Sequence, residues 1–422
     1  MESKYKNKPW VIEAKRAHEE KIIIYKTDSD IILHVNDNKL VIPPSQQYSL
    51  IRPTFEDLNK ALSSTANSPL YKDGKTLRQL FDAEYAKYEE LAKLAYLKGM
   101  REPDYGSYVF DFYTGNLYLI APVFWHRLGL VTNNSKLLTD VNSKLSWQEI
   151  REIFDNAVIG FVGASVGGNI LEGAMREIRP KTAKVADMDW IEITNLNRLE
   201  RGSIQFLAAS LATRTDINDS FDITRINKAE IAAYQQNMID PYCEWYVYPD
   251  GINSDNIKQF LLGNKSEPKI DILVEEADDL RLKVELRKLC REHKIPVLMF
   301  SDFGHMAQGQ FQDFKKDKNL SLGYKISDNE LFASLEKAMT SGTREDRFAF
   351  IRALCGKDFE KDEFGLWVSG EGEQPTSSVP QSGATAMTSG GIGGKIIAMY
   401  LLGYTIPERF IYDLKHFRVI SS

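Results

Sequence analysis

The run from Val158 to Asn169, VIGFVGASVGGN, constrains the fold more than any other stretch of the chain. A short run of strand type leads into closely spaced glycines, and the apolar residues after Asn169 recur at helical spacing. A strand that turns through glycines into a helix begins a nucleotide-binding βαβ unit, because the glycines let backbone amides approach phosphate oxygens at the positive end of the helix. The sequence therefore predicts a Rossmann-like unit.

Strands and helices continue to alternate after this unit. Further strands are predicted over 183–187, 271–277 and 295–301, and a helix over 280–293. Another helix precedes the glycine run, where Ser146 and Glu149 have the spacing of a capping box. This order predicts an α/β fold with a mostly parallel sheet and helices on both faces. We place the core of this domain at 143–310.

The rest of the chain is divided by its patterns into two parts. The pattern over residues 1–142 predicts an α+β accessory region. It contains a β meander over 21–43, an amphipathic helix over 76–100 and a hairpin over 108–120. The domain itself spans 143–422, and its C-terminal segment, 311–422, contains a crossover loop rich in Gly, Ser and Pro over 363–391 and an apolar helix over 392–402.

Composition and charge exclude several classes of function. A formal net charge of −6 provides no basic field for nucleic acid, and the lysine-rich first residues do not form a secretion signal. No run reaches the roughly 18 to 20 apolar residues that a membrane span requires. The three cysteines are odd in number and widely spaced, which excludes a disulfide framework or a CxxC zinc site. We expect a cytoplasmic protein that binds neither nucleic acid nor membranes.

The candidate chemistry lies in a few positions after the glycine run. Gly163-x-Ser165-x-x-Gly168 departs from the dinucleotide fingerprint at its middle position, so Ser165 is either a polar ligand of phosphate or a turn residue. Asp187 ends the second strand, where a carboxylate can accept hydrogen bonds from ribose hydroxyls. A turn without ligand and an oxidoreductase linked to NAD(P) or FAD stay open as alternatives.

The stretch after Asp187 favours ATP over NAD. Residues 187–198 read DMDWIEITNLNR, and Asn227-Lys228 then begin a helical pattern. Hydride transfer does not need this asparagine and pair of cations. An enzyme that brings a carboxylate against ATP needs them, because Arg198 and Lys228 would offset the phosphate charge as pyrophosphate leaves.

These motifs resemble the ThiF/MoeB/HesA superfamily, the ubiquitin-activating-enzyme-like adenylyltransferases, whose signature is a glycine turn, a strand that ends D-x-D, and N-L-x-R. The stretch 271–279, DILVEEADD, is similar to the family's D-x-V-x-D-x-x-D-N strand end. Stand-alone bacterial ThiF-family proteins are the best match, and the resemblance covers roughly residues 145 to 310 on these motifs. It implies ATP and Mg²⁺ as cofactors, and no structural zinc, because the family's paired CxxC ligands are missing.

The resemblance also implies roles for single residues. Asp278 takes the position of the catalytic aspartate that coordinates Mg²⁺, and Arg198 and Lys228 contact the phosphates. The positions that match the nucleotide site are Gly163, Ser165, Gly168, Asp187, Asp189 and Asn195.

The implied reaction turns a carboxylate into an acyl adenylate with release of pyrophosphate. The expected partner is a small ubiquitin-like protein or peptide with a free C-terminal carboxylate, and the expected assembly is a homodimer. A thioester step is disfavoured, because Cys290 lies in an apolar helical register and only Cys355 follows the core. A nucleotide-binding regulatory or scaffold protein of the same fold, without turnover, is the alternative. It is motivated by Ser165 and by the lack of a clear match to the arginine that family members present before the glycine strand.

Overall fold

The computed structural model describes the strands within residues 6–120, residue 86, and residues 145–192, 195, 197–198, 227–237, 239–240, 242–356 and 382–421. The first strands are β1 (Lys6–Asn7), β2 (Trp10–Glu13), β3 (Ile22–Lys26), β4 (Ile31–Val35), β5 (Asn38–Ile42), β6 (Ser107–Phe110) and β7 (Leu117–Ile120). The elements from the glycine unit onward are α5 (Trp147–Asn156), β8 (Val158–Val162), α6 (Val166–Glu177), β9 (Thr182–Ala186), α8 (Lys228–Asn237), β10 (Glu244–Tyr248), α9 (Ile257–Leu262), β11 (Ile272–Glu275), α10 (Leu280–Glu292) and β12 (Val297–Phe303). The C-terminal elements are β13 (Met306–Gln312), α11 (Asp328–Ser341), α12 (Arg344–Cys355), α14 (Gly383–Leu401), β14 (Arg409–Asp413) and β15 (Arg418–Ser421).

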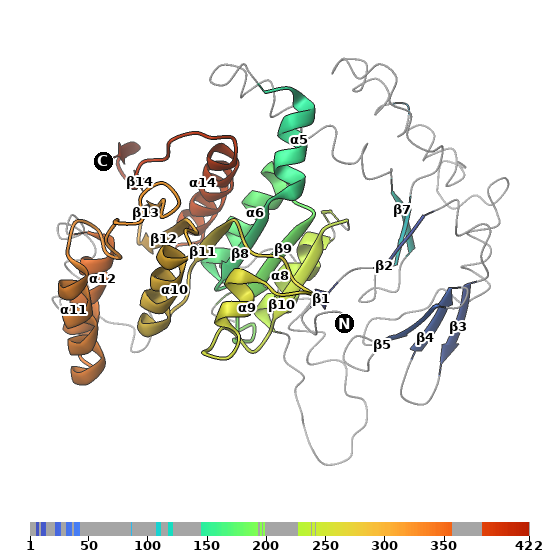
Figure 1. The fold of residues 1–422 in the computed structure, drawn as a ribbon, viewed down its shortest axis with the longest axis horizontal. Coiled ribbons are helices and arrows are strands. Elements are labelled where there is room, and N and C mark those ends of the chain that lie inside the picture. The colour runs from blue at the N-terminus through green and yellow to red at the C-terminus, as the bar shows by residue number, and fades with distance from the viewer. Residues whose placement is uncertain are drawn as a thin grey trace, which may run out of the picture.

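A sheet of nine strands organises the described part of the chain, in the order β1-β10-β9-β8-β11-β12-β13-β14-β15 (Figure 1). The strands from β10 to β12 are parallel, and in chain order they run third, second, first, fourth, fifth, which is the doubly wound arrangement. The strands outside this group, β1 and β13 to β15, are antiparallel to their neighbours. The predicted α/β class is confirmed, and the antiparallel extension is a feature that the sequence patterns did not predict.

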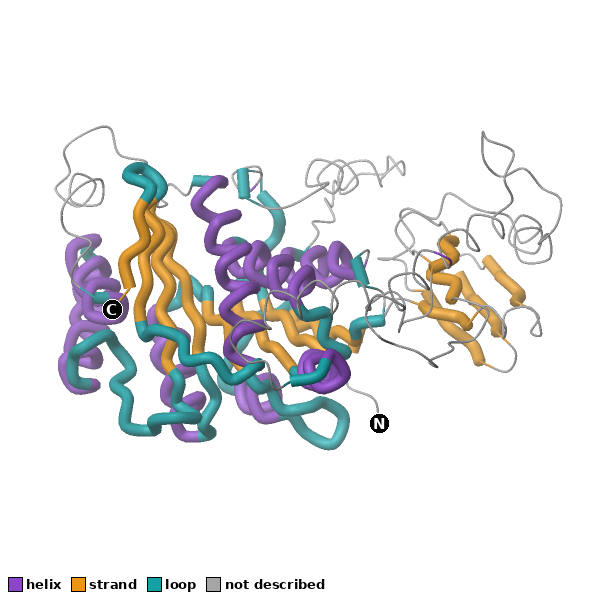
Figure 2. Tube along the Cα trace, turned by 90° about the horizontal axis from the view of Figure 1, so that it is seen from above, coloured by secondary structure: helices purple, strands orange, loops and turns teal. Residues whose placement is uncertain are grey.

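Helices cover both faces of the parallel strands, as Figure 2 shows from above. Side chains of β8 alternate between the faces: Ile159 and Phe161 pack in one buried cluster, and Val158 and Val162 in the other. The first cluster is completed by residues of α5, α6, α8 and α14, and the second by residues of α9, α10, α11 and α12. Burial on both faces explains why β8 reads as a continuous apolar run.

Helix α14 corrects the prediction of a crossover loop over 363–391, since the chain is helical from Gly383 onward. The sequence predicted a loop here because the segment is rich in Gly and Ser. Its glycines serve close packing against α6: a Cβ at Gly173 would lie 2.1 Å from the carbonyl oxygen of Gly390, and one at Gly394 would lie 2.2 Å from the carbonyl carbon of Gly173. Glycine removes the side chains that would hold the two helices apart. Residues 363–381 lie outside the described part.

Other local predictions have mixed outcomes. The capping box of α5 is present, with Ser146 N donating to the Glu149 carboxylate at 2.7 Å. The meander predicted over 21–43 is the antiparallel sheet β3-β4-β5, and the predicted hairpin is β6-β7, to which β2 adds a strand. The helix predicted over 76–100 lies outside the described residues apart from residue 86, which is helical. The boundary at residue 142 stays a prediction. Among the described residues, no helix is long and apolar enough to cross a membrane.

Candidate functional site

The candidate site lies at the carboxyl ends of the parallel strands, where the strand order reverses between β8 and β11. Open α/β sheets bind their ligands in the crevice at this point. A pocket of about 400 Å³, counting the space open to solvent, begins at the glycine turn and continues along one face of α8. The residues that line it include Ala164, Ser165, Gly168, Asn169, Arg198 and Lys228. The structure therefore brings together five of the positions predicted from the sequence: two glycine-turn residues, Ser165 and Gly168, the two cations, and, through the contacts described next, Asp187.

Gly163 makes the sharp turn from β8 into α6. Its φ of +93° disfavours any residue with a side chain, and a Cβ there would lie 2.5 Å from the Glu276 carbonyl oxygen. Gly168, by contrast, has open space where a Cβ would be. The two glycines thus differ in role, because Gly163 is required by the backbone whereas Gly168 leaves the N-terminal turn of α6 open to the pocket.

Asp187 holds the glycine turn against the end of β9. Its carboxylate accepts hydrogen bonds from Ala164 N at 2.6 Å and from Asp189 N at 2.8 Å. Burial raises the pKa of this carboxyl, and the two backbone hydrogen bonds act in the opposite direction. The described structure thus gives Asp187 a role in shaping the turn, and contact with a ribose stays a prediction.

Lys228 enters the pocket from the first turn of α8. Its Nζ lies 3.0 Å from a carboxylate oxygen of Asp189, which is itself exposed. The preceding residue, Asn227, connects several backbone segments by hydrogen bonds, and its pattern in the sequence did not assign it to the site. Its Nδ2 donates to the carbonyl oxygens of Asp187, Asp189 and Pro249 at 2.9 to 3.2 Å, and its Oδ1 accepts from two amides at the start of α8. Asn227 therefore fixes the direction in which Lys228 leaves the helix.

Arg198 lies beside Ser165 at the glycine turn. Its Nε donates to Ser165 Oγ at 2.8 Å, and its backbone carbonyl accepts from Asn169 Nδ2 at 2.8 Å. Ser165 is therefore more than a turn residue, because its hydroxyl orients one of the two cations. Asn195 is buried, and its Oδ1 accepts from Glu192 N at 3.0 Å, so in the described structure it stabilises the turn that carries Arg198. Contact of Asn195 with phosphate stays a prediction.

Three carboxyl groups follow or end the neighbouring strands β11 and β12. Asp278 is exposed, and its charge acts on Arg198 together with that of Asp302, while burial lowers the pKa of the guanidinium. Burial raises the pKa of Glu276 well above the usual range, and its Oε1 accepts from Phe300 N. Glu276 and Asp302 were not among the predicted site residues. Their place at the carboxyl ends of two predicted strands was the available signal.

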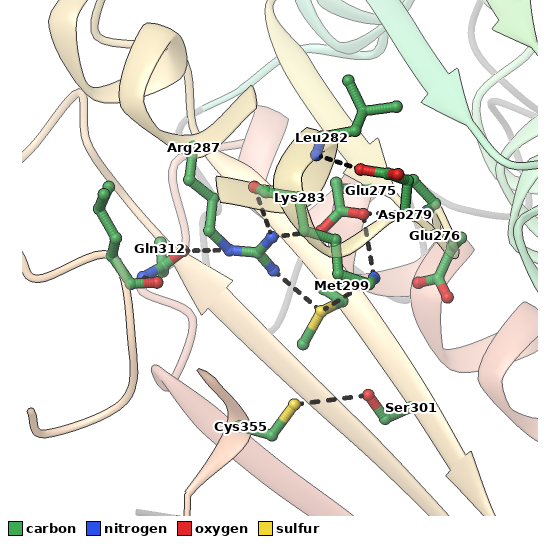
Figure 3. A network of polar contacts seen from close by, with 12 residues as sticks. Glu275, Glu276, Asp279, Leu282, Lys283, Arg287, Met299, Ser301, Gln312 and Cys355 are labelled. Carbon is green, nitrogen blue, oxygen red and sulfur yellow. Dashed lines mark hydrogen bonds and ion pairs between the residues drawn. The ribbon is translucent and has the colours of Figure 1, made fainter. Parts of the chain in front are cut away.

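A buried ionic network joins the end of β11 to α10 (Figure 3). Glu275 is fully buried between Lys283, at 3.0 Å, and Arg287, with which it forms a short contact. Burial alone would raise the pKa of Glu275, but the two positive charges outweigh it and hold the pKa below the usual value. Arg287 also donates to Gln312 at 3.2 Å, which joins α10 to β13. The network fixes the helix that Asp279 caps, one residue after Asp278.

The three cysteines of the chain are all buried, namely Cys243, Cys290 and Cys355. Cys290 lies in the core, as the sequence predicted, and burial raises its pKa. Cys355 Sγ lies 3.6 Å from Ser301 Oγ, and burial raises its pKa too (Figure 3). A reactive thiol has an accessible, electropositive setting. Neither thiol has the properties of an acyl acceptor.

The described residues contain no group of three or more His, Cys, Asp or Glu side chains that could hold a metal ion alone. Mg²⁺ keeps several waters and is usually bound by one or two carboxylates together with substrate phosphates. An exposed carboxylate beside a pocket lined by two cations suits that mode of binding. Asp278 fits the position of such a ligand.

The strand order and the glycine turn at the reversal point define an α/β fold of the Rossmann type. Residues 157–343 match the model of the ThiF family. This part of the chain thus has the fold of the family's adenylating enzymes.

Curated relatives match the same part of the chain. The uncharacterized protein MT1398 of Mycobacterium tuberculosis is 32% identical over 160 residues, which are 38% of this chain and 19% of that protein. The tRNA threonylcarbamoyladenosine dehydratase of Escherichia coli is 25% identical over 156 residues, which are 37% of this chain and 50% of the enzyme. The matches thus span half or less of the length of these relatives.

Solved structures with similar folds include PaaA, with a TM-score of 0.45 and 14% identity over 84% of this chain and 99% of that chain. MccB of Escherichia coli with ATP has a TM-score of 0.42 and 13% identity over 98% of this chain and 96% of that chain.

Proposed function

We propose that the protein is an ATP-dependent adenylyltransferase that activates a carboxylate as an acyl adenylate. The observation that carries this proposal is the convergence of Arg198 and Lys228 on one pocket at the glycine turn. A carboxylate oxygen attacks the α-phosphorus of ATP, the bond to the β-phosphate oxygen breaks, and pyrophosphate leaves with its electron pair. Both reactants are anions, so two fixed cations and the N-terminus of α6 stabilise charge where it develops.

The residues of the site divide this work. Arg198 and Lys228 are each held by a neighbouring protein group, Ser165 and Asp189, and can exchange these contacts for phosphate oxygens without changing the backbone. Asp278 would hold Mg²⁺, which supplies charge neutralisation between the nucleotide and the attacking carboxylate when bound. No protein nucleophile is needed, because orientation supplies much of the rate in this step.

The proposed substrate is the C-terminal carboxylate of a small protein or peptide. Because all three cysteines are buried, the acyl adenylate passes directly to an external nucleophile instead of a thiol of this chain. A homodimer is the proposed assembly, to be checked by analytical ultracentrifugation. The relative from Escherichia coli is named as a dehydratase of a modified tRNA nucleoside, so tRNA is tested as a second class of substrate.

Pyrophosphate exchange tests the proposal. The protein is incubated with ATP, Mg²⁺, labelled pyrophosphate and a panel of peptides with free C-termini, with tRNA assayed in parallel. We expect label to enter ATP with at least one carboxylate, and Arg198→Lys to lower the exchange rate roughly 100-fold, since lysine lacks the planar fork of donors. Arg347→Lys is the matched control, because Arg347 is exposed on α12 and does not line the pocket. Binding of ATP without exchange for any carboxylate would contradict the proposal.

The second candidate is a nucleotide-binding protein without turnover. It is favoured by the contacts of Ser165 and Asp189 with the two cations, which leave the site internally paired before a ligand arrives. Asp278→Asn separates the two functions. Loss of exchange with retained ATP affinity supports the enzyme, and an unchanged phenotype of that variant in cells supports the binding protein.

A further inference from the structure

Asp302 is a buried carboxyl group next to the proposed active site that the reaction described above does not use. It lies in β12 with 5% of its surface exposed. Its Oδ1 accepts a hydrogen bond from Ser389 Oγ of α14 at 2.6 Å, whereas its Oδ2 is buried without a partner among the described residues. A buried carboxylate oxygen without a donor costs free energy. Such an atom indicates a donor that arrives in another state of the site.

The charged neighbours of Asp302 identify that donor. Among the described residues, the positive charge that acts on Asp302 is Arg198, and Arg198 in turn is affected by Asp302 and by Asp278. The other ionisable neighbour is Glu276, whose pKa burial raises well above the usual range and whose own pKa is raised further by the charge of Asp302. Arg198 is therefore the counter-ion that this environment provides.

Helix α14 contacts both partners. Ser389 anchors Asp302, as described, and six residues earlier Gly383 packs on the turn before Arg198, where a Cβ would lie 2.2 Å from the Asn197 carbonyl oxygen. Arg198 and Asp302 are thus fixed relative to each other by one helix. A guanidinium carries five N–H donors in a rigid fork, so it can bind Ser165, a carboxylate and a phosphate at the same time.

We propose that Asp302 is a positioning residue whose free Oδ2 accepts a hydrogen bond from Arg198 when ATP is bound, and thereby orients the guanidinium toward the phosphate. Ser389 acts as the anchor of Asp302, since its hydroxyl occupies Oδ1 and leaves Oδ2 for the arginine. This inference rests on the proposed adenylation and explains how a half-buried arginine keeps one orientation during the reaction.

Calorimetry of Mg-ATP binding at pH 6, in buffers of different ionisation enthalpy, tests the pairing without turnover. Burial raises the pKa of Asp302 to about 6, against the hydrogen bond of Ser389 and the charge of Arg198. Asp302 is therefore about half protonated before binding, and pairing with Arg198 should release up to about half a proton more from the wild type than from Asp302→Asn. Equal proton release by both proteins would overturn the proposal.

Pyrophosphate exchange adds a readout that a merely structural role would not change. We expect Asp302→Asn to lower kcat at least about tenfold and to remove the rise in kcat through pH 6 that the wild type shows. Ser389→Ala keeps the charge and should cause a smaller loss. If the wild type exchanges and Asp302→Asn exchanges equally with the same pH profile, this inference is wrong and the adenylation proposal stands. If the wild type binds ATP and never exchanges, the adenylation proposal fails, and the proton release on binding still decides the pairing.

Discussion

Replacing Asp302 by Asn should stabilise the protein at neutral pH while it impairs the reaction. Burial raises the pKa of this carboxyl from 3.8 to about 6. The folded state thus holds the proton more tightly than the unfolded chain, so the contribution of Asp302 to stability is fully present below pH 3.8 and is lost as the pH rises through about 6. A shift of about two pH units corresponds to about 3 kcal/mol at pH 7 and to about half of that at pH 5.

Asn is uncharged at every pH and keeps an oxygen for Ser389, so the variant should escape this loss. We expect Asp302→Asn to exceed the wild type in the free energy of unfolding by up to about 3 kcal/mol at pH 7, and by about 1.5 kcal/mol at pH 5. Urea unfolding at the two pH values measures the difference. Asp255→Asn, at an exposed position, is the control and should give a difference near zero at both. A difference that does not grow between pH 5 and pH 7, or a variant less stable than the wild type at pH 7, would refute the reasoning.

Three further changes test other parts of the structure. Gly163→Ala should cost at least about 2 kcal/mol in urea unfolding, because φ is positive and the Cβ would meet the Glu276 carbonyl, whereas Gly168→Ala should not destabilise, since its space is open. Arg287→Met should cost about 3 to 5 kcal/mol by leaving Glu275 short of a partner, and adding Glu275→Gln should recover part of that loss; no recovery would mean that packing, not charge, dominates. When every cysteine is replaced by alanine in a variant that still folds, transfer of the activated acyl group to an external nucleophile should persist, and loss of that transfer with pyrophosphate exchange intact would point to a reactive thiol at Cys243, Cys290 or Cys355.

The local signals that the sequence carried are those with a short-range physical cause. The glycine turn is set by the positive φ at Gly163, the helix α5 by the capping box of Ser146, and the strand β8 by an apolar run buried on both faces. Each of these leaves a pattern of residue types within a few positions of the sequence, so the α/β class and the place of the glycine turn could be predicted.

Motif spacing also predicted part of the candidate site. Ser165, Arg198 and Lys228 were predicted together and line one pocket. The sequence could not show that Ser165 contacts Arg198, or that Asp187 bonds the glycine turn, because these contacts join residues from different loops.

Tertiary structure decided the features that rest on contacts between distant segments. The Gly-rich segment after 382 is a helix whose glycines allow close packing on α6, which lies some 200 residues earlier in the chain. In the same way, Asp302 is a plain strand residue in the sequence, and it becomes a buried carboxyl group with one free oxygen only where β12, α14 and the turn of Arg198 meet. The burial of Asp302 and its position relative to the charge of Arg198 arise only where these three segments pack together. No local pattern of residues encodes them.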